Sequence, residues 1–127
     1  MESVPLFARC SKSELGRIAQ LADEIDLPAG KVLAQQGDRG REFFVLLDGS
    51  AEVQADSDPR PPLGPGDFFG EVALVTDQSR TATVTALTPV RALVITDRAF
   101  KELMRTSPEL QTKILEATAD RLAATTL

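Results

Sequence analysis

Apolar residues near the start of the chain follow the period of a helix. Four of them recur at positions that share one helix face: Leu15, Ile18, Ala19 and Ala22. They follow Ser11-x-x-Glu14, a pattern typical of a capping box at the first turn of a helix. A second, shorter helical element is expected over residues 4–7. We therefore predict that N-terminal helices occupy residues 1–23.

Short apolar runs separated by turn-forming residues fill the middle of the chain. Runs rich in Val, Leu, Phe and Thr occupy residues 31–35, 42–47, 51–55, 81–86 and 91–95. Clusters of Gly, Pro and Asp separate them, as expected for strands joined by turns. Asp48-Gly49, between two of these runs, predicts a β-hairpin, whereas residues 56–62 form a patch rich in Pro and Asp. Several short strands at this spacing favour a sandwich or barrel over residues 24–96.

Helical spacing returns after residue 96. The expected N-cap of the next helix is Asp97. That helix carries three apolar residues: Phe100, Leu103 and Met104. Ser107-Pro108 predicts the start of a last helix, because proline suits the first helical position. One side of the last helix is expected to carry Leu110, Ile114, Leu115, Thr118 and Leu122. C-terminal helices therefore occupy residues 97–127, and residues 1–127 form a single, mainly β domain with flanking helices.

Composition then narrows the possible function classes. The 127 residues include 14 basic and 19 acidic side chains, and the net charge of −5 disfavours binding to nucleic acids or anionic membranes. There is no His and only one cysteine, Cys10, which argues against His-dependent catalysis and against metal sites built from His or thiolates. The longest apolar run, residues 43–47, is too short to span a bilayer. We expect a cytoplasmic protein without a membrane segment.

The segment that carries recognisable chemistry begins at Gly70. Glycine permits tight backbone geometry there, and residues 71–75 are expected to form one short helical turn. The free N–H groups and the dipole at the start of such a turn attract anions. Arg80 follows after a loop, and arginine is suited to bidentate contact with a phosphate. Together with the hydroxyl and N–H of Thr81, this segment predicts an anion-binding site.

Glu71 does not fit a site for an anion alone, because its carboxylate repels a phosphate. It fits if it accepts hydrogen bonds from a hydroxyl, such as a ribose 2′-OH. Two simpler alternatives stay open. Glu71 can be an acid that complements the helix dipole, or it can form an ion pair with Arg80. The combination of Glu71 and Arg80 in one turn-helix-loop-strand segment indicates a ligand that offers both an anion and a hydroxyl.

These residues resemble a known family. Phe-Gly-Glu-x-Ala-Leu at residues 69–74 and Arg-Thr-Ala-Thr-Val at 80–84 resemble the phosphate-binding cassette of cyclic nucleotide-binding domains. The resemblance extends over the whole chain and is greatest to the domain of bacterial cyclic-nucleotide-gated channels. It implies a double-stranded β-helix, a jelly-roll-like β-roll, with N-terminal helices, two C-terminal helices and a cassette at about residues 68–84.

The resemblance also implies roles for individual residues. Glu71 would hold the ribose 2′-OH and Arg80 would neutralise the cyclic phosphate. Backbone N–H groups would come from Gly70, Val72 and Ala73. The phosphate and the edge of the base would be lined by Thr81 and Ala82. An apolar strand residue usually supports the base, and the candidates are Ala55 and Leu63. A residue of the last helix usually covers the base, and the candidates are Arg121 or, as apolar alternatives, Leu115 and Leu122.

The sequence therefore predicts a non-enzymatic sensor whose ligand is cAMP or cGMP, with cAMP favoured, and which needs no cofactor. Its C-terminal helix is expected to move when the ligand binds. No helix-turn-helix follows that helix, so the output is expected to lie in a partner protein or a missing effector domain. One alternative is an interaction or scaffold domain with a non-binding β-roll, although this would predict loss of Glu71 or Arg80. A small cupin-like metalloenzyme is less favoured, because only scattered carboxylates could hold its metal.

Overall fold

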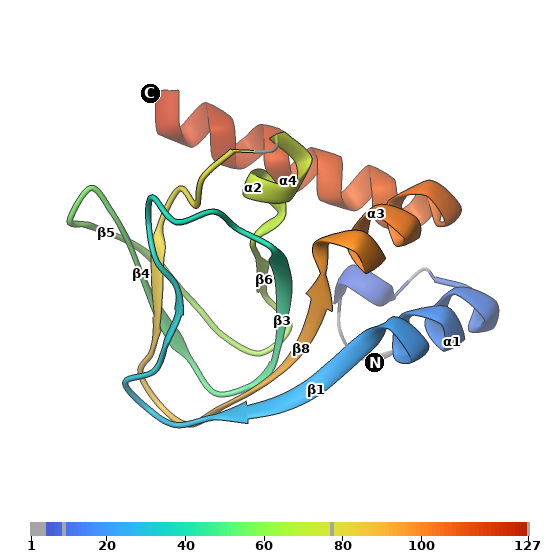
Figure 1. Ribbon diagram of the computed structural model, residues 1–127, viewed down its shortest axis with the longest axis horizontal. Coiled ribbons are helices and arrows are strands. Elements are labelled where there is room, and N and C mark those ends of the chain that lie inside the picture. Colours follow the sequence, from blue (N-terminus) through green and yellow to red (C-terminus); the bar gives the residue numbers. More distant parts are fainter. Residues whose placement is uncertain (1–4, 9, 77, 127) are drawn as a thin grey trace.

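The computed structural model describes residues 5–8, 10–76 and 78–126, with the side chains of residues 5 and 121–126 left out of that description. Its elements follow the predicted order of helix, strands and two helices (Figure 1). The helices are η1 (Pro5–Phe7), α1 (Lys12–Leu21), α2 (Glu71–Thr76), α3 (Asp97–Thr106) and α4 (Pro108–Thr126). The strands are β1 (Ala22–Leu27), β2 (Val32–Ala34), β3 (Glu42–Asp48), β4 (Ala51–Ala55), β5 (Asp58–Leu63), β6 (Phe68–Phe69), β7 (Thr83–Ala86) and β8 (Val90–Thr96).

The strands form two four-stranded antiparallel sheets that face each other as a β-roll. One sheet has the order β1-β8-β3-β6 and the other the order β2-β7-β4-β5. The helices gather against the first sheet, and α4 crosses over α2 (Figure 1). The predicted β-roll with flanking helices is therefore confirmed. Among the described residues, none of the helices has the length and apolar character that a membrane crossing requires.

The apolar run in β3 is continuous because both faces of this strand are buried. Side chains alternate between the two faces of a strand. Phe43 and Val45 pack in a cluster with the helices, and Phe44 and Leu46 pack in a second cluster inside the roll. Phe44 also stacks on Phe69 of β6, with ring centroids 4.7 Å apart. This aromatic pair fixes the strand that leads directly into α2.

The Asp48-Gly49 turn joins the two sheets and does not close a hairpin, so that prediction is wrong. Strands β3 and β4 do not pair with each other. Instead, β3 pairs with β6 and β8, and β4 pairs with β5 and β7. The hairpin connects β4 to β5 instead, through Asp56 and Ser57, which have φ values of 54° and 66°. Positive φ at both central residues matches the twist of paired strands.

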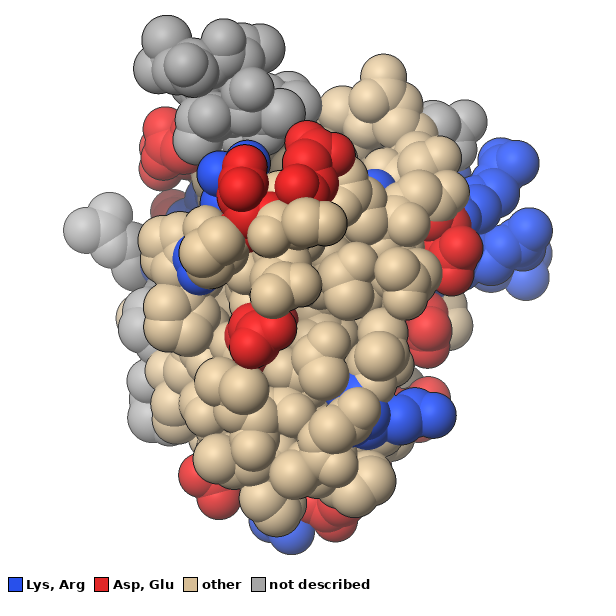
Figure 2. All heavy atoms as spheres, turned by 90° about the vertical axis from the view of Figure 1, so that its left-hand side faces the viewer, with Lys and Arg blue, Asp and Glu red and all other residues tan. Residues whose placement is uncertain are grey.

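Residues 56–62, noted only as a Pro/Asp-rich patch, contain most of strand β5. Proline cannot donate a hydrogen bond to a neighbouring strand, so it is confined to edge strands and bulges. β5 lies at the edge of its sheet, and its ladder with β4 is irregular between Ala51 and Val53. Figure 2 views the side of the molecule where β4 and β5 lie, and there the charged side chains are interspersed among a larger number of uncharged ones.

The N-terminal capping box is confirmed. The Ser11 hydroxyl accepts from the backbone N–H of Glu14 at 3.1 Å, and the Glu14 carboxylate accepts from the N–H of Ser11 at 3.0 Å. Ala22 is not on the helix face as predicted; it caps α1 with extended backbone and begins β1, which pairs with β8. The roll therefore begins two residues earlier than expected.

The C-terminal helices differ from the prediction in two details. The N-cap of α3 is Thr96, whose hydroxyl accepts from the N–H of Ala99 at 3.3 Å, and not Asp97. On α4, Leu115 is 48% exposed, so it does not share the buried face. The buried residues on that helix are spaced four apart: Leu110, Ile114 and Thr118. The side chain of Leu122 lies outside the described residues.

Candidate functional site

The short helix α2 is positioned by a glycine that no other residue could replace without strain. Gly70 has a φ of 101° and ends β6 immediately before Glu71. A Cβ atom there would lie 2.7 Å from both Nη1 of Arg80 and the carbonyl oxygen of Glu42. A side chain at this position would therefore collide with the Arg80 guanidinium and with the backbone of Glu42. The prediction of a helical turn behind Gly70 is confirmed.

Arg80 lies beneath the start of α2 and is only 8% exposed. Its Nη2 donates to the backbone carbonyl of Glu42 at 2.7 Å, and its Nη1 donates to that of Gly70 at 3.4 Å. Burial lowers the pKa of the Arg80 guanidinium, and the charges of Glu42 and Glu71 act against this shift. Arginine nevertheless remains protonated in proteins. The site therefore holds a buried, oriented cation.

The loop before β3 fixes the backbone of Arg80 and the position of its side chain. The N–H of Arg80 donates to Asp38 at 2.7 Å, and its carbonyl accepts from Gly37 at 3.0 Å. A Cβ atom on Gly40 would lie 2.7 Å from Nε, 2.8 Å from Cζ and 2.9 Å from Cδ of Arg80. Sequence reasoning missed Gly40 and Glu42 as parts of the site. The paired glycines at residues 37 and 40 were visible, but nothing in the sequence linked them to Arg80.

Glu71 is completely buried, with an exposed fraction of 0%. A carboxylate that only complements a helix dipole would normally remain in water. Val72 and Ala73 are also buried, while Thr81 is exposed and Ala82 half-buried. The structure thus brings Arg80 from the end of the loop to the start of α2. The roles of these residues toward a ligand stay predictions.

The two candidates for supporting a base lie at opposite ends of one ladder. Ala55 pairs with Asp58 beside the hairpin turn, whereas Leu63 pairs with Ala51. Four residues along β4 separate the two positions, or about 13 Å at the usual rise of a strand. The start of β7, at the end of the cassette, pairs next to Ala55. The Ala55 end is therefore the end nearer to Arg80, and the two residues cannot support the same base.

Polar side chains surround a hollow of about 380 Å³ at the same end of the second sheet. The Gln36 side chain donates to the Asp56 carboxylate and accepts from the Asp56 N–H, both at 2.8 Å. The hydroxyl of Thr83 accepts from the N–H of Gln36 at 3.0 Å. These bonds tie the tip of the β4–β5 hairpin to the chain that follows β2 and to β7. Nothing in the sequence indicated this arrangement.

The cassette helix packs against the last helix. Leu74 of α2 belongs to the same buried cluster as Leu110 and Ile114 of α4. Figure 1 shows α4 passing over α2 toward its C-terminal end. Arg121 lies on that part of α4, and its side chain is outside the described residues. A displacement of α2 would therefore directly change the packing of α4.

The fold and the site define a ligand-binding β-roll with a buried cation and a buried carboxylate at one short helix. Comparison with known proteins identifies its family. The family described as "Cyclic nucleotide-binding domain" matches residues 24–107, so the chain belongs to this family. It is a cyclic nucleotide-binding regulatory domain, and such a domain binds its ligand without catalysing a reaction.

Three curated relatives span several protein types. A cyclic nucleotide-gated potassium channel of Mesorhizobium japonicum is 38% identical over 109 residues, which cover 85% of this chain and 30% of the channel. A cAMP-dependent protein kinase regulatory subunit of Emericella nidulans is 36% identical, covering 82% of this chain and 26% of the subunit. A cGMP-dependent protein kinase of Drosophila melanogaster is 34% identical, and the match covers 89% of this chain and 16% of the kinase. The chain thus spans less than a third of these relatives.

A solved structure shares the fold. The cAMP-bound chain PfPKA-R (141-441) superposes with a TM-score of 0.84 at 24% identity, covering 99% of this chain and 45% of that chain. At this identity the likeness concerns the architecture. It supports the same arrangement of β-roll and flanking helices described above.

Proposed function

We propose that the chain is a sensor that binds a 3′,5′-cyclic nucleotide at the start of α2. The observation that carries this proposal is the burial of two opposite charges, Glu71 and Arg80, with Glu71 following Gly70 in the chain and Arg80 packed against Gly70. Burying a charged group is costly unless the charge is paired and hydrogen-bonded. In this proposal Arg80 neutralises the cyclic phosphate, and Glu71 accepts a hydrogen bond from the ribose 2′-OH.

The chemistry of the site suits this division of roles. A guanidinium has five N–H donors in a fixed plane, and Arg80 uses two contacts to hold itself against Glu42 and Gly70. Its other donors can turn to a phosphate while these two keep the side chain in place. The backbone N–H groups of residues 71–73 supply further donors, because the first N–H groups of a helix have no partner within it.

We further propose that cAMP is preferred over cGMP. Relatives whose names specify cAMP support this preference, although a cGMP-dependent kinase is similarly related. Thr81 is exposed and offers a hydroxyl to either base. Isothermal titration calorimetry with both nucleotides tests both proposals. Saturable binding with a lower Kd for cAMP supports both proposals. Equal or reversed Kd values contradict the preference for cAMP. The absence of binding heat with both nucleotides contradicts the proposed sensor function.

The signal is proposed to leave through α4. Leu74 connects the cassette to the buried face of α4, so a ligand that moves α2 changes the packing of that helix. A ligand can shift a conformational equilibrium only as far as it binds the two states differently. We propose that α4 closes over the base in the bound state and that a cytoplasmic partner protein or effector segment responds to this closure.

A further inference from the structure

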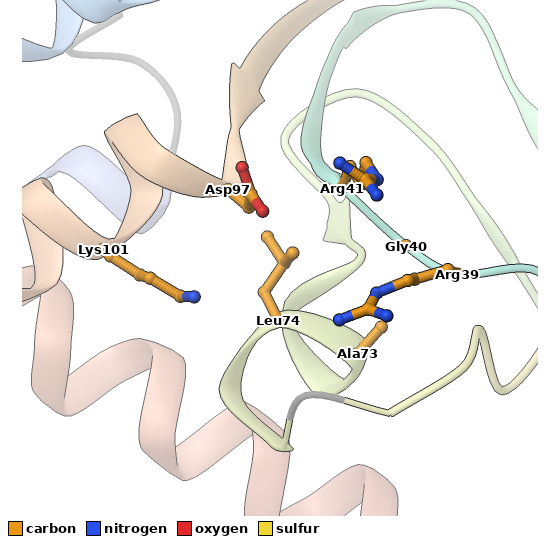
Figure 3. Close-up of a pocket in the computed structure, with 7 residues that line it drawn as sticks. All are labelled: Arg39, Gly40, Arg41, Ala73, Leu74, Asp97 and Lys101. Carbon is orange, nitrogen blue, oxygen red and sulfur yellow. The ribbon is translucent and has the colours of Figure 1, made fainter.

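A second hollow, of about 230 Å³, lies between α2, the loop at residues 39–41 and the start of α3 (Figure 3). Ala73 and Leu74 contribute its wall on the side of α2. Neither Glu71 nor Arg80 lines it. The hollow therefore excludes the two charged residues of the proposed nucleotide site, although it shares Ala73 with that site.

Positive charge dominates the lining of this hollow. Arg39, Arg41 and Lys101 line it, and Asp97 is the acidic residue in the lining. Figure 3 shows the side chains of Arg39 and Lys101 extending toward the hollow from opposite sides. The carboxylate of Asp97 accepts a hydrogen bond from the N–H of Arg98 at 2.7 Å, and its single negative charge stands against three cationic side chains. In a chain of net charge −5, this is a local excess of cations.

The loop that carries Arg39 and Arg41 is held in place by backbone contacts. Arg39 forms a β-bridge with Ser79, and the carbonyl of Arg41 accepts from the N–H of Asp97 at 2.7 Å. These contacts join the loop to the cassette on one side and to α3 on the other. A loop whose backbone is already ordered loses less entropy when a ligand binds.

We propose that this hollow binds a small phosphate ion, such as inorganic phosphate. Its volume is below the range of about 300–1,000 Å³ that is usual for sites of drug-sized ligands. Arg forms bidentate hydrogen bonds with phosphate oxygens, and Lys supplies a compact positive charge. Size and charge together therefore favour a compact oxyanion over a second nucleotide.

Two-dimensional NMR of the ¹⁵N-labelled chain, titrated with inorganic phosphate against potassium chloride of equal ionic strength, tests this proposal. We expect saturable shifts of the amides at residues 39–41 and 97–101. Lys101→Met should weaken phosphate binding about fivefold, the scale of one partly exposed charge. Arg98→Met is the matched control, because Arg98 is exposed on the same helix but does not line the hollow, and it should leave the affinity unchanged.

Two outcomes would overturn the proposal. Shifts that do not saturate, or that equal those in potassium chloride, would show that phosphate acts only through ionic strength. Saturable shifts centred on Thr81 and Ala82 that persist in Lys101→Met would place the phosphate at Arg80. The spectra also report whether each variant is folded, and the test does not depend on cyclic nucleotide binding.

Discussion

The guanidinium of Arg80 donates a hydrogen bond to the backbone carbonyl of Glu42 over 2.7 Å, although 38 positions separate the two residues. This bond joins the end of the cassette to the start of β3. It orients the guanidinium of Arg80, and the N–H groups of Arg80 that do not bond to the protein can donate to a ligand. It also makes Arg80 a structural residue as well as a proposed binding residue.

The first prediction concerns truncation of Arg80. Arg80→Ala should weaken cyclic nucleotide binding by about 2–5 kcal/mol, because an anion would be left without its buried cation. It should also lower the free energy of unfolding by about 1–3 kcal/mol through loss of the bonds to Glu42 and Gly70. Calorimetry and urea unfolding measure the two effects. Arg80→Lys is the control, since it keeps the charge but loses the planar donor pair. A folded Arg80→Ala variant with unchanged affinity would contradict the assigned role.

The second prediction concerns the hydroxyl that Glu71 is proposed to bind. The 2′-deoxy analogue should bind the unmodified chain about 1.5–3 kcal/mol more weakly than the parent nucleotide, the scale of a hydrogen bond to a charged group. In Glu71→Gln this difference should shrink, because the neutral amide is a weaker acceptor. Calorimetry with both ligands and both proteins measures the coupling. Equal affinities in all four combinations would mean that Glu71 is a buried acid at a helix start and no more.

The third prediction tests the close approach of Gly40 to Arg80. Gly40→Ala should displace the guanidinium, since the new Cβ would lie 2.7–2.9 Å from Nε, Cζ and Cδ of Arg80. We expect the affinity for cyclic nucleotide to fall by at least about tenfold, or about 1.4 kcal/mol. Gly64→Ala is the matched control, because a Cβ there has no neighbour within 4 Å. If both variants bind alike, the position of Arg80 does not depend on Gly40.

The fourth prediction is a dependence of stability on pH at the junction of the helices. The pKa of Glu14 is held below its ordinary value of 4.5, first by the hydrogen bond from the Ser107 hydroxyl and then by the N–H of Ser11. A lowered pKa in the folded state adds stability above the unfolded pKa, and this stability is lost as the pH falls through the folded pKa. The stability gap between the unmodified chain and Ser107→Ala should therefore be larger at about pH 6 than at about pH 3.

Urea unfolding at the two pH values measures this gap. Ser13→Ala is the control, since Ser13 is exposed on the same helix as Glu14. Its gap should be the same at both pH values. A Ser107→Ala gap that does not change with pH would show that the Ser107 hydroxyl does not stabilise the ionised form of Glu14.

The fifth prediction concerns the proposed closure of α4. At a ligand concentration of about 100 times Kd, the chain should gain about 2.7 kcal/mol of stability, or roughly 10 °C in Tm for a domain of this size. Amide hydrogen exchange should slow at residues 70–73 and at 115–122. Protection limited to residues 70–73 would contradict the closure, while leaving the binding site intact.

The sequence alone determined those features that depend on neighbouring residues. The capping box needs only Ser11 and Glu14, which lie three residues apart. The cassette is similarly local, because Gly70, Glu71 and Arg80 lie within eleven positions and the short helix between them follows from that order. The apolar run at residues 42–47 likewise predicted the strand β3.

Only the tertiary structure decided which distant segments meet. The Asp48-Gly49 turn reverses the chain, but the burial of β3 and β4 in different sheets determined their partners. Likewise, the contacts of Arg80 with Gly40 and Glu42, and the cations that Arg41 and Lys101 bring to one hollow, join segments far apart in sequence. Turn and capping preferences act over a few residues, whereas strand pairing depends on how the whole chain buries its apolar surface.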